Sequence, residues 1–205
     1  MSDPQTYLLA LRAAHGERVI VLCAGEGESL IHFGVKLPDA AEWARIAGDL
    51  AQSNAAAAEL ALRRAVVGVT AEETTAERAR LESILNDDPC LGDLWGAQIL
   101  AAVGMNAKVE TSPAEGGGFN LTANVGETTI TVTCRKRSRP EWAELRSIAV
   151  KRGPMEMSKA AYDRLITSAN KAQVAERYPA LVQALGDAAA QAGSRAVAGA
   201  APLGL

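Results

Sequence analysis

The segment Thr128–Leu145 reads TTITVTCRKRSRPEWAEL and joins three local patterns. Its first part, TTITVTCR, alternates polar and apolar residues with the period of two that is typical of a half-buried strand. Pro140 is suited to the first turn of a helix, and Trp142 follows inside that turn. Upstream, Phe119–Val125 is a second strand-like run, separated by the turn residues Gly126-Glu127. The segment therefore predicts a β-hairpin followed by a helix.

The first half of the chain carries the same order of signals. Arg18–Ala24 (RVIVLCA) is β-branched and apolar, and Ser29–Val35 alternates again after the glycine and glutamate turn at 25–28. Pro38 then starts a helix, in which Glu42-Trp43-Ala44 matches the later Glu141-Trp142-Ala143. A second hairpin-plus-helix pattern is thus expected before residue 100.

A further match lies near the end of each half. Pro89 has Gly96 seven residues after it, and Pro179 has Gly186 at the same distance. We interpret the pattern as an α+β fold of two small units in tandem, each a β-hairpin followed by packed α-helices. Internal duplication is one explanation, and chance similarity in an alanine-rich chain is the other. The expected boundaries are 1–106, 107–193 and a flexible C-terminal tail at 194–205.

The remaining helices are predicted from periodicity and end signals. Thr70 with Glu73 fits a capping box, Asp88 and Pro89 fit the N-cap and first position of a helix, and Ser158 fits an N-cap. The expected helices are Tyr7–Ala14, one from Pro38, Ala55–Val67, one from Thr70 to Asn86, one from Pro89 to Val103, one from Pro140, one from Ser158, and Ala180–Ala192. Structural anchors are expected at Trp43, Trp95, Trp142, Pro89 and Pro179.

Composition indicates a globular protein. The 205 residues are 48% hydrophobic and 22% charged, which is ordinary for a folded domain. No apolar run approaches the roughly 20 residues of a membrane span, so no span is expected. The N-terminal sequence lacks the basic and apolar regions of a secretory signal, so synthesis in the cytoplasm is expected.

Residues that carry chemistry are sparse, and no enzyme, metal or cofactor is predicted. The two histidines, His15 and His32, form no close ligand pair, and no CxxC motif exists. Cys23, Cys90 and Cys134 are interpreted as reduced, small buried residues, with an intermolecular disulfide through Cys90 as the alternative. Asp87-Asp88 near Glu82 is interpreted as a helix cap with solvated neighbours rather than a magnesium site.

The principal charge run is Arg135, Lys136, Arg137 and Arg139, supported in sequence by Lys151-Arg152. Three interpretations remain open: a solvated turn, docking to an acidic protein surface, and contact with nucleic-acid phosphates. The isoelectric point near 5.5 and the lack of interleaved aromatic residues disfavour nucleic acid. Residues 1–106 hold 8 basic and 15 acidic residues, whereas 107–205 hold 13 and 9. This asymmetry has three open interpretations: the halves dock on each other, copies associate head to tail, or the charges vary by chance on a solvated surface.

The chain resembles the small tail-assembly chaperones of tailed bacteriophages. The resemblance rests on Val19–Leu22, the following glycine and acid turn, Pro38 with Trp43, Val66-Val67 and the terminal helix from Asp88-Pro89. The second half is similar through Pro140-Glu141-Trp142 and Tyr178–Leu181. Baseplate hub-associated proteins of contractile tails have related folds.

This resemblance implies binding without catalysis, because the family has no catalytic residues to match. It implies apolar grooves between helices and sheet edges, with phage tail or baseplate proteins, or further copies of the chain, as partners. The implied location is the host cytoplasm during assembly. The apparent duplication and the tail depart from the family pattern, which makes retention in the virion an equal alternative. A nucleic-acid-binding or host-directed adaptor that uses residues 135–139 is the other functional hypothesis.

Overall fold

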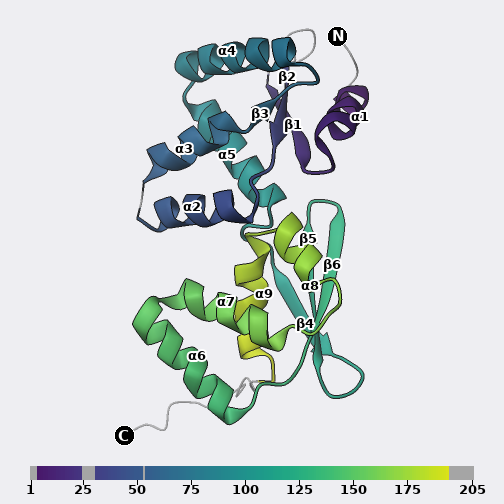
Figure 1. Ribbon diagram of the computed structural model, residues 1–205, viewed down its shortest axis with the longest axis vertical. Helices are drawn as coiled ribbons and strands as arrows, with labels where there is room; N and C mark the ends of the chain where they lie inside the picture. The colour runs from purple at the N-terminus through teal and green to yellow at the C-terminus, as the bar shows by residue number, and fades with distance from the viewer. Residues whose placement is uncertain (1–3, 25–30, 53, 194–205) are drawn as a thin grey trace, which may run out of the picture. The chain divides into compact units, whose positions relative to one another are not determined.

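The computed structural model describes residues 4–24, 31–52 and 54–193, and these form an α+β chain of two compact units (Figure 1). The first unit comprises Met1–Ala107 with Val125–Glu127 and Gln173–Leu181. The second comprises Lys108–Asn124, Thr128–Ala172 and Val182–Leu205. The short segments 125–127 and 173–181, which the sequence assigned to the second unit, thus pack with the first. The expected tail, 194–205, lies outside the described residues.

The first unit contains a three-stranded antiparallel sheet and five helices along its continuous stretch. Strands β1 and β2 pair from Val19 opposite Lys36 to Ala24 opposite Ile31, which confirms the hairpin. The elements are α1 (Pro4–His15), β1 (Val19–Ala24), β2 (Ile31–Lys36), α2 (Ala40–Ala51), α3 (Ala55–Arg64), β3 (Val66–Val67), α4 (Ala71–Asp87) and α5 (Cys90–Ala102).

The prediction of one helix over Ala55–Val67 is wrong at its end. Helix α3 stops at Arg64, and Val66 and Val67 form β3, which pairs with β2 opposite Val35 and Gly34. β-Branched valines favour an extended backbone, and the edge of β2 offers hydrogen bonds that a helix end lacks. Gly34 is required there because a Cβ would lie 2.6 Å from the Leu11 side chain of α1 and 2.6 Å from the Val67 carbonyl oxygen.

Of three predicted helix starts in this unit, the one at Thr70 is confirmed, because Thr70 caps α4 in a full capping box with Glu73. The helix expected from Pro38 begins at Ala40 instead, and Asp39, expected in its first turn, is its N-cap in a capping box with Glu42. Asp88 differs, because it ends α4 and Pro89 takes the N-cap position of α5, one residue later than expected. The Asp88 side chain still accepts a hydrogen bond from the Cys90 amide at 3.1 Å.

The core of the first unit lies between its sheet and α4 and α5. Trp95 is 3% exposed, lies edge-on to Phe33 at 5.3 Å between ring centroids, and donates its indole N–H to the Cys23 carbonyl at 3.1 Å. Trp43 is half-buried and packs against the same cluster. Pro89 is exposed and therefore is not a core anchor, whereas Pro179 is buried.

A buried carboxyl group joins α1 to α4 in this unit. The Tyr7 hydroxyl donates a hydrogen bond to Oε1 of Glu77, and burial raises the pKa of Glu77 above its ordinary value of 4.5. The folded chain therefore holds this proton to higher pH than the unfolded chain does. Because the unfolded chain then binds fewer protons, Glu77 lowers the free energy of unfolding as pH rises above about 4.5.

Glu77→Gln tests this contribution. Glutamine still accepts the Tyr7 hydroxyl but carries no charge, so we expect it to raise the free energy of unfolding at pH 7 relative to the wild type. The gain should shrink toward pH 4, where the wild-type carboxyl is protonated in both states. Urea denaturation at pH 4 and pH 7 measures both effects. A difference independent of pH would contradict a buried titrating carboxyl at this position.

The second unit contains another three-stranded antiparallel sheet, in the order β4-β5-β6. Its inner face carries Leu121, Ala123 and Val132, all at most 1% exposed. Its outer face is polar, with hydroxyl and amide pairs such as Thr122 with Thr131 at 3.2 Å and Thr129 to Asn124 at 2.9 Å. The elements are β4 (Val109–Pro113), β5 (Phe119–Val125), β6 (Thr128–Cys134), α6 (Arg139–Arg152), α7 (Pro154–Leu165), α8 (Lys171–Arg177) and α9 (Leu181–Gln191).

One expectation for these helices is wrong, and one helix has no counterpart among the predicted elements. Ser158 does not cap a helix: it lies inside α7 and is fully buried, and its hydroxyl oxygen lies 2.9 Å from the Pro154 carbonyl oxygen and 2.5 Å from Oδ1 of Asp187, which share its single proton. Pro154 itself starts α7 after Gly153, whose positive φ of 94° suits glycine. Helix α8 is a short element that the periodicity did not reveal.

Within the described residues, no helix is both long and apolar enough to cross a membrane.

Candidate functional site

The basic cluster lies where β6 leads into α6, and its residues have different roles there. Ser138 is the N-cap of α6, so the backbone from Arg135 to Arg139 turns out of the sheet and enters the helix within a few residues. Glu141 completes a capping box by accepting the Ser138 amide at 2.8 Å. The helix start is therefore rigid and already holds one carboxylate.

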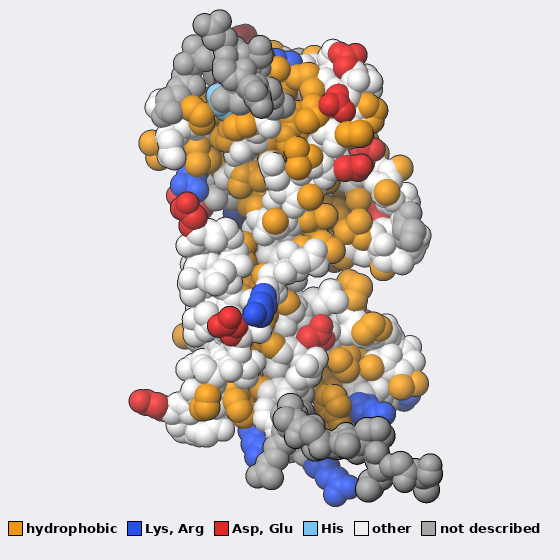
Figure 2. Space-filling model, turned by 180° about the vertical axis from the view of Figure 1, so that it is seen from behind, with side chains coloured by type: hydrophobic (Ala, Val, Ile, Leu, Met, Phe, Trp, Pro, Cys, Tyr) orange, Lys and Arg blue, Asp and Glu red, His pale blue; other side chains and the backbone are white. Residues whose placement is uncertain are grey.

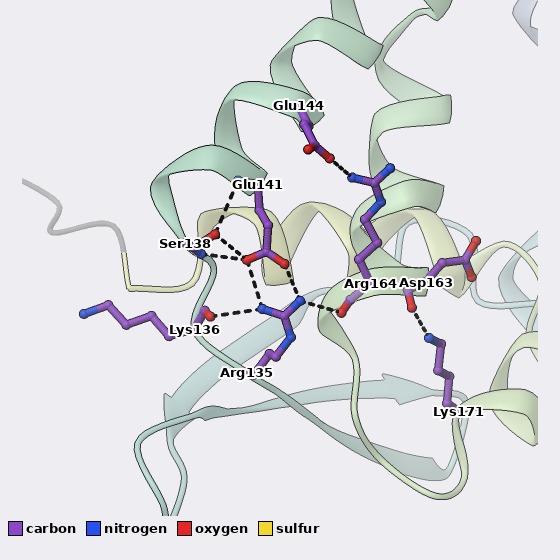
Figure 3. Close-up of polar contacts among 8 residues, drawn as sticks. All are labelled: Arg135, Lys136, Ser138, Glu141, Glu144, Asp163, Arg164 and Lys171. Carbon is purple, nitrogen blue, oxygen red and sulfur yellow. Dashed lines mark hydrogen bonds and ion pairs between the residues drawn. The ribbon is translucent and has the colours of Figure 1, made fainter.

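Arg135 forms an ion pair with the Glu141 carboxylate (Figure 3). Its guanidinium binds both oxygens of Glu141, with Nη1 at 3.0 Å from Oε2, and it donates to the Arg164 carbonyl at 3.2 Å. This pairing holds the pKa of Glu141 well below its usual range and raises that of Arg135. Arg135 thus fixes the loop and contributes no net charge to the surface.

Arg137 is half-buried, and its guanidinium contacts α9 and Trp142. Its Nη1 donates to the Ala192 carbonyl at 2.7 Å, just beyond the C-terminal end of α9, where the helix dipole favours a cation. Its guanidinium carbon lies 4.8 Å from the centroid of the Trp142 ring, which is a cation–π geometry. Trp142 is therefore half-buried beside Arg137, rather than a buried core anchor.

Lys136 and Arg139 are exposed and have no carboxylate partner in the part of the chain that the structure describes. Together with Arg137, Ser138, Trp142, Ala192 and Gly193 they line an open cavity of about 210 Å³, which we call the basic pocket. Figure 2 shows Lys and Arg side chains gathered on this part of the second unit.

Lys151 and Arg152 do not join this site. They are exposed in the last turn of α6, and at 1.5 Å per residue they lie roughly 20 Å along the helix from Arg139. There they complement the negative end of the helix dipole. Lys151 and Arg152, which the sequence predicts to support the cations at residues 135–139, therefore lie at the other end of the same helix.

Among the described residues, the histidines, cysteines and acidic residues considered above do not come together in a metal site. Among residues 4–24, 31–52 and 54–193, no three His, Cys, Asp or Glu side chains are placed to hold a metal ion. Cys134 is buried, as expected, but Cys23 and Cys90 are exposed, which corrects the interpretation of all three as buried. The glycine and glutamate turn at 25–28 lies outside the described residues.

An apolar cavity in the first unit is too small to act as a groove for a partner. It lies between the sheet and α3, α4 and α5, and its lining includes Leu62, Leu81 and Trp95. Its volume is about 30 Å³, which holds only a few water molecules. Hydrophobic side chains are nevertheless abundant on the face of this unit that Figure 2 shows.

Comparison with protein-family models, with curated proteins and with solved structures returns no match to this chain.

Proposed function

We propose that this chain is a non-enzymatic binding protein that serves the assembly or structure of a phage tail or baseplate. In this proposal the basic pocket of the second unit binds an acidic surface of a tail protein. Binding takes place in the host cytoplasm during assembly, and the chain either leaves or remains in the particle.

The arrangement of cations in the basic pocket is the observation that carries the proposal. Arg135 is neutralised by Glu141, but Lys136 and Arg139 extend from a rigid helix start without a carboxylate partner among the described side chains. Arg137 is already oriented by Ala192 and Trp142. Arg137 is therefore preorganised and would lose little side-chain entropy on binding a carboxylate, and Lys136 and Arg139 add positive charge beside it.

The resemblance to tail-assembly chaperones supports the biological setting of the proposal. That resemblance rests on short elements, and the α+β order of a hairpin followed by helices is present in both units. The acidic balance of residues 1–106 and the basic balance of 107–205 are compatible with a chain that joins others in an assembly.

Charge reversal tests the basic pocket. A glutamate-rich peptide is titrated against the full chain by tryptophan fluorescence, to which Trp142 beside the pocket contributes, and by calorimetry. The double variant Lys136→Glu with Arg139→Glu should weaken peptide binding by roughly tenfold or more, since two attractions become repulsions. The matched control reverses Lys151 and Arg152, the pair at the other end of the same helix, and should bind as the wild type does. An equal loss of peptide affinity in both variants would contradict binding at the basic pocket, because the net charge of the chain would then determine the affinity.

A second experiment separates the tail proposal from the nucleic-acid alternative. Single-stranded and duplex oligonucleotides replace the peptide, and the salt dependence of affinity counts the phosphates contacted. Tight oligonucleotide binding lost in the 136/139 variant would favour the adaptor hypothesis. Mass spectrometry of purified phage particles and of tail proteins purified from the lysate then tests the setting. Absence of the chain from both would overturn the tail assignment.

A further inference from the structure

The two units repeat one arrangement around their sheets. In the first unit, the Lys36 amide at the end of β2 donates to the Ala65 carbonyl, directly after α3, at 2.7 Å. In the second unit, the Arg135 amide, directly after β6, donates to the Leu165 carbonyl at the end of α7 at 3.0 Å. Each of these bonds closes a pair of helices, α2 with α3 or α6 with α7. Lys36 thus corresponds to Arg135, and Ala65 to Leu165.

The strand register supports the same correspondence. Val35 pairs with Val66 in the first unit, and Cys134 pairs with Ile166 in the second. Each pair lies directly beside the hydrogen bond that closes the helices of its unit. Residues of α2 therefore correspond to residues of α6, and residues of α3 to residues of α7.

One position in the first helix of each pair differs in the sign of its charge. Asp39 caps α2 and Ser138 caps α6, each in a capping box, so the two helices start at corresponding places. Six residues after these caps lie Arg45 in the first unit and Glu144 in the second. An arginine thus takes the place of a carboxylate.

The second unit fills this place with an ion pair of its own. Arg64 and Arg164 correspond to each other, because each lies one residue before the carbonyl that closes its pair of helices. Nη1 of Arg164 lies 2.5 Å from Oε2 of Glu144 (Figure 3). In the first unit the residue at the position of Glu144 is Arg45, which has the same charge as Arg64 and cannot neutralise it.

A cavity of about 170 Å³ lies at this place between α2 and α3, and it is much larger than the space that one water molecule needs. Arg45 and Arg64 both line it, and neither forms an ion pair with a residue that the structure describes. Glu42 is the only acidic residue of the lining, and its Oε2 already accepts the Asp39 amide at 3.0 Å. The charged side chains of the lining therefore leave one net positive charge.

We propose that this cavity binds a carboxylate group between Arg45 and Arg64, in the role that Glu144 has in the second unit. One carboxylate balances the single positive charge, and a guanidinium donates to carboxylate oxygens in a favourable planar geometry. The side chains of Ile46 and Leu62 line the same cavity and suit the methylene groups that carry a carboxylate.

The charge of the lining favours a carboxylate over a phosphate. A doubly charged phosphate exceeds the one positive charge available, and Glu42 repels it more strongly. The carboxylate comes either from an acidic side chain of a protein or from a small organic acid, since both present the same group. The cavity lies in the first unit, so the inference does not depend on the basic pocket.

Propionate is the first probe, because it presents one carboxylate on a short aliphatic chain. The isotope-labelled full chain is titrated with sodium propionate at constant ionic strength, and the arginine Nε–H signals are followed by NMR. The signals of Arg45 and Arg64 should shift and saturate with a dissociation constant on the order of 1 mM, since one carboxylate gains few hydrogen bonds. Shifts that never saturate, or inorganic phosphate that binds as tightly as propionate, would overturn the proposal.

A charge reversal supplies the carboxylate from within the chain. Arg45→Glu should pair with Arg64 as Glu144 pairs with Arg164, and propionate affinity should fall by roughly tenfold or more. The residue is exposed, so circular dichroism should show an unchanged fold. The matched control Arg80→Glu changes the net charge equally on the exposed face of α4, outside the cavity, and should bind as the wild type does. Equal losses in the two variants would contradict binding at this cavity.

A glutamate with both backbone ends blocked distinguishes the two sources of the carboxylate. If it shifts the Arg45 and Arg64 signals at lower concentration than propionate does, the site recognises an acidic side chain of a protein. If propionate binds more tightly, the site recognises a small organic acid. If neither probe shifts these signals, the cavity is not a carboxylate site.

Discussion

Gly186→Ala is expected to destabilise the second unit by about 3 kcal/mol. A Cβ at this position in α9 would lie 1.9 Å from the Ser158 carbonyl oxygen and 2.7 Å from its carbonyl carbon. These are backbone atoms of α7, and they cannot rotate away as the end of a side chain can. Ser158 is itself held by Pro154 and Asp187. The helices would have to separate, which would open the core between them. Urea denaturation followed by circular dichroism measures the loss.

Gly96→Ala is the matched control in the first unit. Gly96 occupies the corresponding place in α5, seven residues after a proline, but a Cβ there would meet only the Leu62 Cδ1 atom at 3.1 Å. That methyl group can shift, and alanine favours a helix by about 1 kcal/mol over glycine. A near-neutral effect is expected. Equal effects at the two glycines would contradict the close approach of α9 to α7.

Trp95→Ala should destabilise the first unit by about 3–5 kcal/mol. The side chain is 3% exposed, contacts Phe33 edge-on, and supplies the hydrogen bond to the Cys23 carbonyl at the end of β1. Alanine would leave a large cavity between α5 and the sheet and would remove the partner of that carbonyl. The midpoint of thermal unfolding of the full chain should fall, with the second unit's transition unchanged if the units unfold separately.

Trp95→Phe separates packing from hydrogen bonding. Phenylalanine keeps a ring against Phe33 but has no N–H, so the loss should be smaller, about 1–2 kcal/mol. If phenylalanine cost as much as alanine, the hydrogen bond to Cys23 rather than the packed volume would hold this helix in place. If neither change mattered, Trp95 would not be an anchor of the unit.

Local patterns predicted most of the elements because their signals lie within a few residues. The alternation of Thr128–Cys134 specified a strand, and the capping box at Thr70 specified a helix start, since each depends on near neighbours. Elements that depend on distant partners were missed. Val66-Val67 becomes a strand only because β2 lies beside it, and Ser158 is buried only because α9 packs on α7.

The candidate site likewise combines features that the sequence predicts with features that depend on distant residues. The sequence located the run of cations at residues 135–139 and the helix that follows it, because both are continuous in the chain. It could not assign roles within the run, since these depend on residues brought near by folding: Glu141 neutralises Arg135, and Ala192 and Trp142 hold Arg137.

By itself, the sequence determined the α+β class, the tandem hairpin-plus-helix order and the position of the basic run. These follow from side-chain period, turn residues and helix caps, which act over short distances. Only the tertiary structure decided the third strand of the first sheet and the composition of the basic pocket. Each of those depends on backbone or side-chain groups far apart in sequence, whose pairing is specified by packing of the whole unit.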